Sequence, residues 1–167
     1  MALSNETSYS VATGGDAFLV LVSGRANYMN CRAFGDFLET ASETGRRTLI
    51  LDVKNCVSLD STVLGFIAGA ANDFRKLGGE LYIQNASGRV RDVIVNLGLP
   101  ELLTLLPEGE TVPVADALLG AETQAQGNAP AAGGAILRAH ETLMAANPEN
   151  VARFKDVVAF MREDLKK

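Results

Sequence analysis

The chain has 167 residues, of which 47% are hydrophobic and 21% charged, and a formal net charge of −5. This length and composition are typical of one folded domain with an appendage and exclude a disordered chain. The acidic balance, without any cluster of Lys or Arg, argues against proteins that bind nucleic acid or anionic membrane surfaces, which leaves protein or small-molecule partners.

Strand and helix patterns alternate from the N-terminus onward. The predicted elements of the first part are strands over 9–13 and 17–23, a helix over 30–45, a strand over 47–53, a helix over 60–77, a strand over 80–85 and a helix over 87–98. Gly14-Gly15 is typical of a hairpin turn, and Gly45, Gly78-Gly79 and Gly98 follow the helices as stop signals.

A short strand over 102–106 and a helix over 114–119 complete this unit, which we place at residues 1–121. A strand pair followed by repeated alternation of helix and strand predicts an α/β fold with a mixed β-sheet of about five strands and helices packed on it. Residues 122–134 are small and polar without an apolar period, which predicts a flexible linker.

Residues 135–167 predict a helical hairpin tail, because Asn147-Pro148 can cap and begin its second helix. That helix carries one apolar stripe, formed by Val151, Phe154, Val158, Met161 and Leu165. The stripe must be buried on the domain, on the preceding helix or on another copy of the chain. The C-terminal helices are therefore a candidate homodimer interface.

Metal and cofactor sites are not expected. Cys31 and Cys56 are too far apart for a CxxC site, and the single histidine, His140, cannot supply the clustered ligands of a zinc site. The first residues lack a basic leader, and the early apolar run AFLVLV is far shorter than the roughly twenty residues of a membrane helix. We expect a cytoplasmic protein without membrane insertion.

A polar triplet, Asp60, Ser61 and Thr62, stands directly before the apolar run VLGFIAGAA. Asp60 or Ser61 can accept hydrogen bonds from the free N–H groups of the first helical turn, and capping alone would explain the triplet. The helix behind it is apolar on more than one side, however, and only one face can meet the sheet. Val63 and Phe66 are therefore expected at the surface beside the cap, where they predict a partner surface.

The order of elements, with the segments TLILDV, LDSTVLG, GGELYIQN and GRVRDVIVNLGL, resembles the STAS family, named for sulfate transporters and anti-sigma-factor antagonists. The resemblance covers about residues 8–120, and its most specific part is the run from Asp60 to Leu64, in which Val63 stands where the family usually has glycine. It implies that Ser61 is a phosphoacceptor, flanked by Asp60 and Thr62, and that Asp52 lies near the same loop.

The same resemblance implies a function. The protein would be a phosphorylation-regulated binding module of the anti-sigma-factor antagonist type, which binds an anti-sigma factor serine kinase when Ser61 is unmodified and releases it when Ser61 is phosphorylated. A serine phosphatase would be a second partner. The alternative is a STAS module that is never phosphorylated and serves as a scaffold or as a regulatory subunit of a transport or sensory complex.

Other classes of protein fit less well. A receiver domain phosphorylated on Asp52 would need an acidic pair and a lysine where Val22-Ser23-Gly24 and Leu105-Leu106-Pro107 stand. The chain lacks the glycine-rich nucleotide loops and the GxSxG nucleophile elbow, and we interpret His140 as a solvated or capping residue of the tail. We therefore expect no enzymatic activity.

Overall fold

The computed structural model describes residues 6–126 and 129–166. The strands are β1 (Ser8–Gly14), β2 (Ala17–Ala26), β3 (Thr48–Asp52), β4 (Cys56–Leu59), β5 (Glu80–Gln84), β6 (Thr104–Leu105) and β7 (Thr123–Gln126). The helices are α1 (Arg32–Ala41), α2 (Ser61–Lys76), α3 (Gly88–Asn96), α4 (Pro113–Leu118), α5 (Gly133–Ala146) and α6 (Pro148–Leu165), with 3₁₀ turns η1 (Ser42–Thr44) and η2 (Leu99–Glu101).

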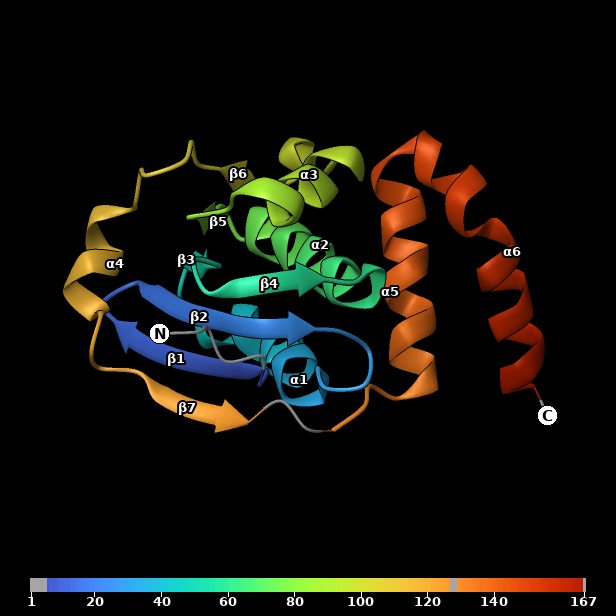
Figure 1. The fold of residues 1–167 in the computed structure, drawn as a ribbon, viewed down its shortest axis with the longest axis horizontal. Coiled ribbons are helices and arrows are strands. Elements are labelled where there is room, and N and C mark those ends of the chain that lie inside the picture. Colours follow the sequence, from blue (N-terminus) through green and yellow to red (C-terminus); the bar gives the residue numbers. More distant parts are fainter. Residues whose placement is uncertain (1–5, 127–128, 167) are drawn as a thin grey trace.

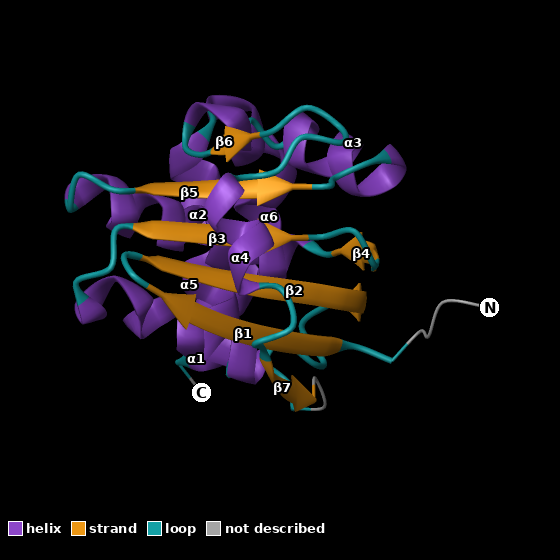
Figure 2. Cartoon of the chain, turned by 90° about the vertical axis from the view of Figure 1, so that its left-hand side faces the viewer, coloured by secondary structure: helices purple, strands orange, loops and turns teal. Residues whose placement is uncertain are grey.

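The strands form one mixed sheet in the order β6-β5-β3-β2-β1-β7, with β4 paired to the end of β2 (Figure 2). The β1–β2 hairpin and the β1–β7 pair are antiparallel, whereas β2, β3, β5 and β6 are parallel neighbours. Parallel neighbours need crossover connections, which α1, α2 and α3 with η2 supply. The predicted α/β class with a mixed sheet is therefore confirmed.

Alternation along the strands separates two apolar layers. Leu19 and Ile50 pack against α4, whereas Val20 and Leu51 belong to the main core, together with α1, α2 and α3. Beyond α2 lies α5, and beyond α5 lies α6, so that the molecule continues past the sheet and its helices in two further layers (Figure 1). Helix α2 thus lies between the sheet and α5.

Two strands were not predicted. Strand β4 was interpreted as loop, and β7 lies within residues 122–134, where a flexible linker was expected. β7 pairs with β1 through its backbone at the edge of the sheet, which requires no apolar alternation in its sequence TQAQ. The linker prediction is therefore wrong for Thr123–Gln126, and residues 127–128 of the same segment lie outside the described residues.

The predicted tail hairpin is present. Asn147 caps α6 by accepting a hydrogen bond from the Glu149 amide at 3.0 Å, and Pro148 begins the helix. Within the stripe of α6, Val158 is buried and Phe154 packs against the main core, whereas Val151 and Leu165 remain exposed. The stripe is thus covered in part by the same chain. Among the described residues, no helix combines the length and apolar character of a membrane span.

Candidate functional site at the start of helix α2

The polar triplet begins α2 as predicted. Asp60 is the N-cap, and its Oδ1 accepts a hydrogen bond from the Val63 amide at 2.9 Å. Its Oδ2 accepts a second bond from the Tyr28 amide at 2.8 Å, which ties the loop after β2 to the start of α2. With both carboxylate oxygens engaged, Asp60 holds Ser61 at the first position of the helix.

The hydroxyl of Ser61 meets a residue from the C-terminal hairpin. Its Oγ lies 2.9 Å from Nε2 of His140 in α5, and Nδ1 of the same ring lies 2.8 Å from the carbonyl oxygen of Ile136. Since a carbonyl can only accept, Nδ1 carries a hydrogen, and in the neutral ring this leaves Nε2 as the acceptor for the hydroxyl of Ser61.

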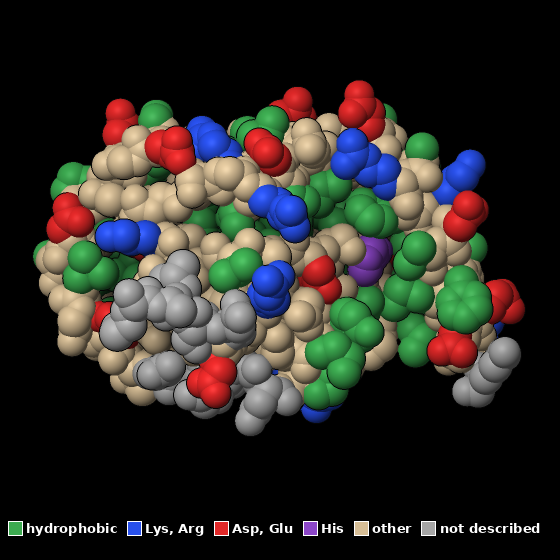
Figure 3. Space-filling model, in the orientation of Figure 1, with side chains coloured by type: hydrophobic (Ala, Val, Ile, Leu, Met, Phe, Trp, Pro, Cys, Tyr) green, Lys and Arg blue, Asp and Glu red, His purple; other side chains and the backbone are tan. Residues whose placement is uncertain are grey.

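His140 is buried, with 6% of its surface exposed, and its ring meets Phe154 of α6 edge-on at a centroid distance of 5.3 Å. In Figure 3 the histidine side chain (purple) is bordered by hydrophobic side chains (green). The interpretation of His140 as a solvated residue was wrong. A signal was present in the sequence, because Ile136, Ala139, His140 and Leu143 share the i, i+3, i+4, i+7 spacing of one helix face.

Of the two residues predicted to form the partner surface, one is buried and the other is intermediate in exposure. Val63 is fully buried in the main core, so the expectation that it lies at the surface is wrong. The reason is that Val63 stands four residues before Ile67, so both lie on the face of α2 that packs into the main core. Phe66 is intermediate in exposure and packs on α1, where its ring would lie 2.8 Å from a Cβ at Gly35.

Close approach of α2 and α5 depends on Gly65. A Cβ at Gly65 would lie 2.3 Å from the carbonyl oxygen of Ala139, which is too close for any side chain. Gly69, one turn later, has nothing within 4 Å of the equivalent position. The two glycines therefore differ: Gly65 allows the two helices to touch, and Gly69 faces open space.

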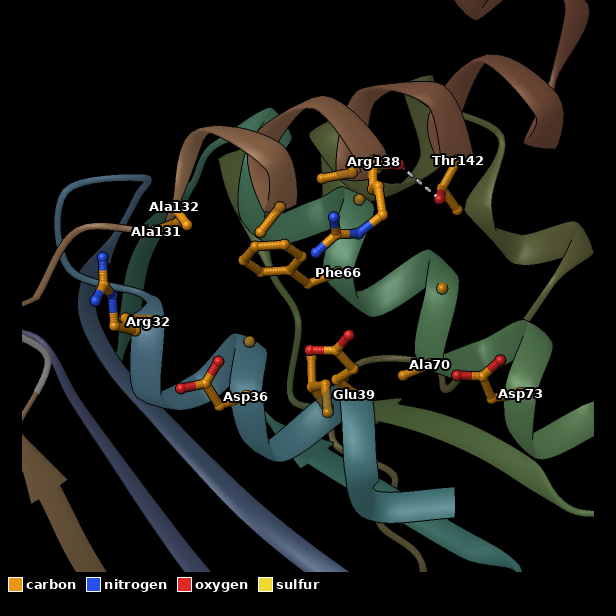
Figure 4. Close-up of a pocket in the computed structure, with 16 residues that line it drawn as sticks. Arg32, Asp36, Glu39, Phe66, Ala70, Asp73, Ala131, Ala132, Arg138 and Thr142 are labelled. Carbon is orange, nitrogen blue, oxygen red and sulfur yellow. Dashed lines mark hydrogen bonds between the residues drawn. The ribbon is translucent and has the colours of Figure 1, made fainter. Parts of the chain in front are cut away.

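Gly69 borders a groove of about 390 Å³ between α1, α2 and α5 (Figure 4). Its walls carry charges of both signs, with Asp36 and Glu39 on α1, Asp73 on α2 and Arg138 on α5. Phe66 lies beneath α5 on the same side of the groove as Arg138. The groove does not include Ser61 or His140 among its lining residues.

The other predicted site residues have different surroundings. Asp52 is buried, and its carboxylate accepts hydrogen bonds from Gln84 Nε2 at 2.9 Å, Asn85 Nδ2 at 3.0 Å and the Lys54 amide at 2.9 Å. These bonds join the ends of β3 and β5 and include no contact with Ser61. Thr62 is buried. Of the three residues expected to flank Ser61, Asp60 is the one whose bonds shape the start of the helix.

The chain has two cysteine thiols, Cys31 and Cys56. Burial raises the pKa of Cys31 to about 12, and the negative charge of Asp60 adds to the effect. Burial likewise raises the pKa of Cys56 to about 11. Both thiols are free and stay protonated at neutral pH. Within the described residues, no group of three or more His, Cys, Asp or Glu side chains could hold a metal ion.

The fold has known counterparts. It is similar to the anti-sigma factor antagonist SpoIIAA in its unphosphorylated form (16% identity, 67% of this chain and 98% of that chain, TM-score 0.53). It is also similar to an anti-sigma factor antagonist from Mycobacterium paratuberculosis (20% identity, 71% and 98%, TM-score 0.55). A third likeness is to the murine anion transporter Slc26a9 (15% identity, 69% of this chain and 22% of that chain, TM-score 0.50).

At these identities the structural likenesses establish the fold alone. No curated protein sequence matches the chain. The sequence model of the STAS domain, however, matches residues 9–112, which is more than half of the chain and runs from β1 to the start of α4. The chain therefore belongs to the STAS domain family.

Proposed function

We propose that this protein is a protein-binding module of the anti-sigma-factor antagonist type, regulated by phosphorylation of Ser61. The observation that carries the proposal is the position of Ser61, a residue of intermediate exposure that is the first residue of α2, directly after the N-cap Asp60. The likeness to SpoIIAA and to the mycobacterial antagonist supports it.

The chemistry of this position suits a switch. A phosphoryl group adds about −1.5 to −2 charges and three acceptor oxygens. At a helix N-terminus these oxygens face free N–H groups and the positive end of the helix dipole, so the fold should tolerate them. Asp60, next to Ser61, repels the new charge and turns it toward solvent. A partner that binds the unmodified surface would then meet a dianion at its edge and dissociate.

The surface that remains for a partner differs from the predicted one. Since Val63 is buried, exposed apolar side chains are offered instead by the loop after β2, where Tyr28 is 50% and Met29 56% exposed. The amide of Tyr28 is bonded to Asp60, so this loop and the start of α2 are one unit. We assign the contact with an anti-sigma factor serine kinase to this unit, with Phe66 at its margin.

In this proposal the protein acts by binding and without catalysis of its own, in the cytoplasm, with a serine phosphatase to reverse the modification. The test is incubation of the purified protein with a candidate anti-sigma factor serine kinase and ATP, followed by intact-mass measurement and peptide mapping. One phosphoryl group on Ser61 is expected, and Ser61→Ala should abolish it. Thr62→Ala is the matched control, because Thr62 is buried and should not be a target.

Binding gives an independent readout. The unmodified protein should retain the kinase in a pull-down, and Ser61→Asp should lose it. Equal retention by both proteins would contradict the switch.

A second function is favoured by one specific observation, which is that Ser61 is engaged by His140 rather than free. A STAS scaffold that is never phosphorylated, as a regulatory subunit of a transport or sensory complex, would tolerate such a permanent contact. The absence of any phosphoryl group on Ser61 after incubation with the kinase, even in a variant that loosens α5, would favour the scaffold.

Self-association through the C-terminal helices stays a prediction. The chain itself covers Val158 and Phe154, but α6 leaves Val157 46% and Phe160 71% exposed. If a homodimer forms here, Phe160→Glu should shift the sedimentation coefficient toward the monomer. If the parent protein already sediments as a monomer and Phe160→Glu leaves its profile unchanged, this interface is ruled out.

A further inference from the structure

We propose that the C-terminal hairpin, α5 with α6, is an intramolecular cover of Ser61, and that its docking and the phosphorylation of Ser61 oppose each other. The inference rests on the proposed function, in which Ser61 is the phosphoacceptor. It adds a regulatory element that the STAS domain of residues 9–112 does not contain. Three observations carry it, one at Ser61, one at Gly65 and one at the turn of the hairpin.

The first observation is the hydrogen that joins the two parts. Ser61 donates its hydroxyl hydrogen to Nε2 of His140 at 2.9 Å, because Nδ1 of His140 is already committed to the carbonyl of Ile136. Phosphoryl transfer from ATP forms an Oγ–P bond, breaks the bond from phosphorus to ADP and releases this same hydrogen as a proton to the kinase's base. The ester oxygen and the phosphoryl oxygens of the dianion can only accept, so they cannot replace the donor.

Modification therefore removes the hydrogen that Ser61 donates to the neutral ring. Nε2 of His140 can then meet the phosphoryl oxygens only if the ring takes up a proton, at a residue with 6% of its surface exposed. The separation of 2.9 Å between Oγ and Nε2 also leaves no room for a phosphoryl group between them. Either the serine side chain turns away or α5 moves outward, and in both cases the bond between the domain and the hairpin is lost.

The second observation is that α5 already lies in backbone contact with α2. The backbone of Ala139 touches α2 at Gly65, where even one added carbon would lie 2.3 Å from the Ala139 carbonyl oxygen. His140 is the next residue along α5, so its ring is held over Ser61 by this contact. A small shift that admits a phosphoryl group must therefore separate the two helices where they are closest.

The third observation concerns how the hairpin is attached. Asn150 donates from Nδ2 to the carbonyl oxygens of Leu97 at 2.9 Å and Leu143 at 2.8 Å, which links the turn of the hairpin to the end of α3 and to α5. At the other end, the Ala131 amide donates to the Tyr28 carbonyl at 2.8 Å. Helices α5 and α6 pack on each other along their length (Figure 1). The hairpin is thus attached as one unit, at its turn and at the segment before α5.

This arrangement has a reciprocal consequence. If phosphorylation weakens docking, then docking must make phosphorylation less favourable by the same factor. The docked hairpin also touches the loop of Tyr28, which we assign to the partner surface. The unmodified, covered protein would therefore be a resting state, and undocking would precede efficient modification.

The first experiment does not depend on any kinase. Phosphoserine is placed at position 61 of the full chain by genetic encoding, and amide hydrogen exchange is compared with that of the unmodified protein. Exchange in α5 should become about tenfold faster or more, as expected for loss of one buried hydrogen bond, while β3 and β5 stay protected. Phosphoserine at Ser87 is the matched control, because Ser87 is an exposed N-cap of α3 and adds the same charge elsewhere.

The second experiment loosens the hairpin without altering Ser61. Gly65→Ala should push α5 away, and Gly69→Ala is its matched control in the same helix, with open space around the new carbon. With the candidate kinase, Gly65→Ala should be phosphorylated on Ser61 several-fold faster than the parent, and Gly69→Ala should match the parent. Protected amides in β3 and β5 would show that Gly65→Ala still folds.

The outcomes separate the two proposals. Unchanged exchange of α5 with phosphoserine at position 61 overturns the cover, whatever the kinase does. Faster exchange of α5 without phosphorylation of any variant supports the cover and overturns the proposed function. Equal phosphorylation rates for the parent and a Gly65→Ala protein whose α5 exchanges faster would leave the switch intact and overturn the cover.

Discussion

The inner and outer sides of helix α2 are held by different chemistry. On the inner side, large apolar residues such as Ile67 and Phe74 are fully buried in the main core. On the outer side, α5 places Leu143 in the same core, but it also meets α2 through a serine-to-histidine hydrogen bond and through backbone contact at a glycine. Apolar packing of the first kind gives stability that no single atom controls, whereas contacts of the second kind can be changed by adding one carbon or one phosphoryl group.

The largest effect is expected on the inner side. Ile67→Ala should lower the free energy of unfolding of the whole domain by about 2–5 kcal/mol, because it leaves a cavity in a fully buried position. The measurement is urea denaturation followed by circular dichroism.

Leu143→Ala is the matched change on the hairpin, since Leu143 of α5 is equally buried. It should speed hydrogen exchange in α5 and α6 well before it affects β3. If both variants lowered the protection of all elements equally, the hairpin and the domain would be one cooperative unit, and the comparison between the two sides would fail.

The next effect is expected at the turn of the hairpin. Asn150 is fully buried and donates two hydrogen bonds to carbonyl oxygens, so Asn150→Ala should cost about 2 kcal/mol and leave both acceptors without a donor. Asn96→Ala is the control, because Asn96 is exposed at the end of α3 and makes no side-chain hydrogen bond within the described part of the chain. A loss of stability equal to that of Asn96→Ala would show that the hairpin is not anchored at this point.

A smaller effect is expected at the N-cap. Asp60→Ala should lower the free energy of unfolding by about 1 kcal/mol, the usual contribution of a helix cap, with a further loss from the bond to the Tyr28 amide. Asp60→Asn keeps one carbonyl oxygen as an acceptor and should lose less. If the two variants were equally destabilised, the charge rather than the hydrogen-bond geometry of Asp60 would be what matters.

The same contrast explains what could be predicted from the sequence. The inner side of α2, the order of elements and the cap at Asp60 follow from apolar spacing and local hydrogen bonding, which involve neighbours in the chain. The hairpin was predicted as two helices, but where it docks was not. The contact between Ser61 and His140 spans 79 positions, and periodicity carries no information about which surfaces meet across that distance.

The misplacement of Val63 has a different origin. Val63 stands four residues before Ile67, so the two share the face of α2 that meets the core, and this spacing was present in the sequence. Strand β7 was missed because an edge strand contributes backbone hydrogen bonds, which TQAQ can make without an alternation of apolar residues.

The smallest effect concerns the two thiols, Cys31 at the N-cap of α1 and Cys56 at the start of β4. Burial is the main cause of the raised pKa of both, but the charge of Asp60 contributes at Cys31 and is not among the causes at Cys56. Asp60→Asn should therefore lower the pKa of Cys31 from about 12 and leave that of Cys56 near 11. Alkylation by iodoacetamide at alkaline pH, read by peptide mapping, should become faster at Cys31 alone.

The raised pKa values also determine whether the free energy of unfolding rises or falls with pH. An unfolded thiol loses its proton near 9.0, whereas the folded thiols keep theirs up to about 11 and about 12. Between these values the unfolded chain binds fewer protons, so the stabilising contribution is complete below pH 9 and declines as the pH rises through this window. Cys31→Ala should flatten the decline of the urea midpoint above pH 9. If Cys31→Ala left the slope of the urea midpoint against pH unchanged, Cys31 would already ionise in the folded protein as it does in the unfolded chain. The surroundings of Cys31 and Asp60 would then be more open to water than the bonds of Asp60 imply.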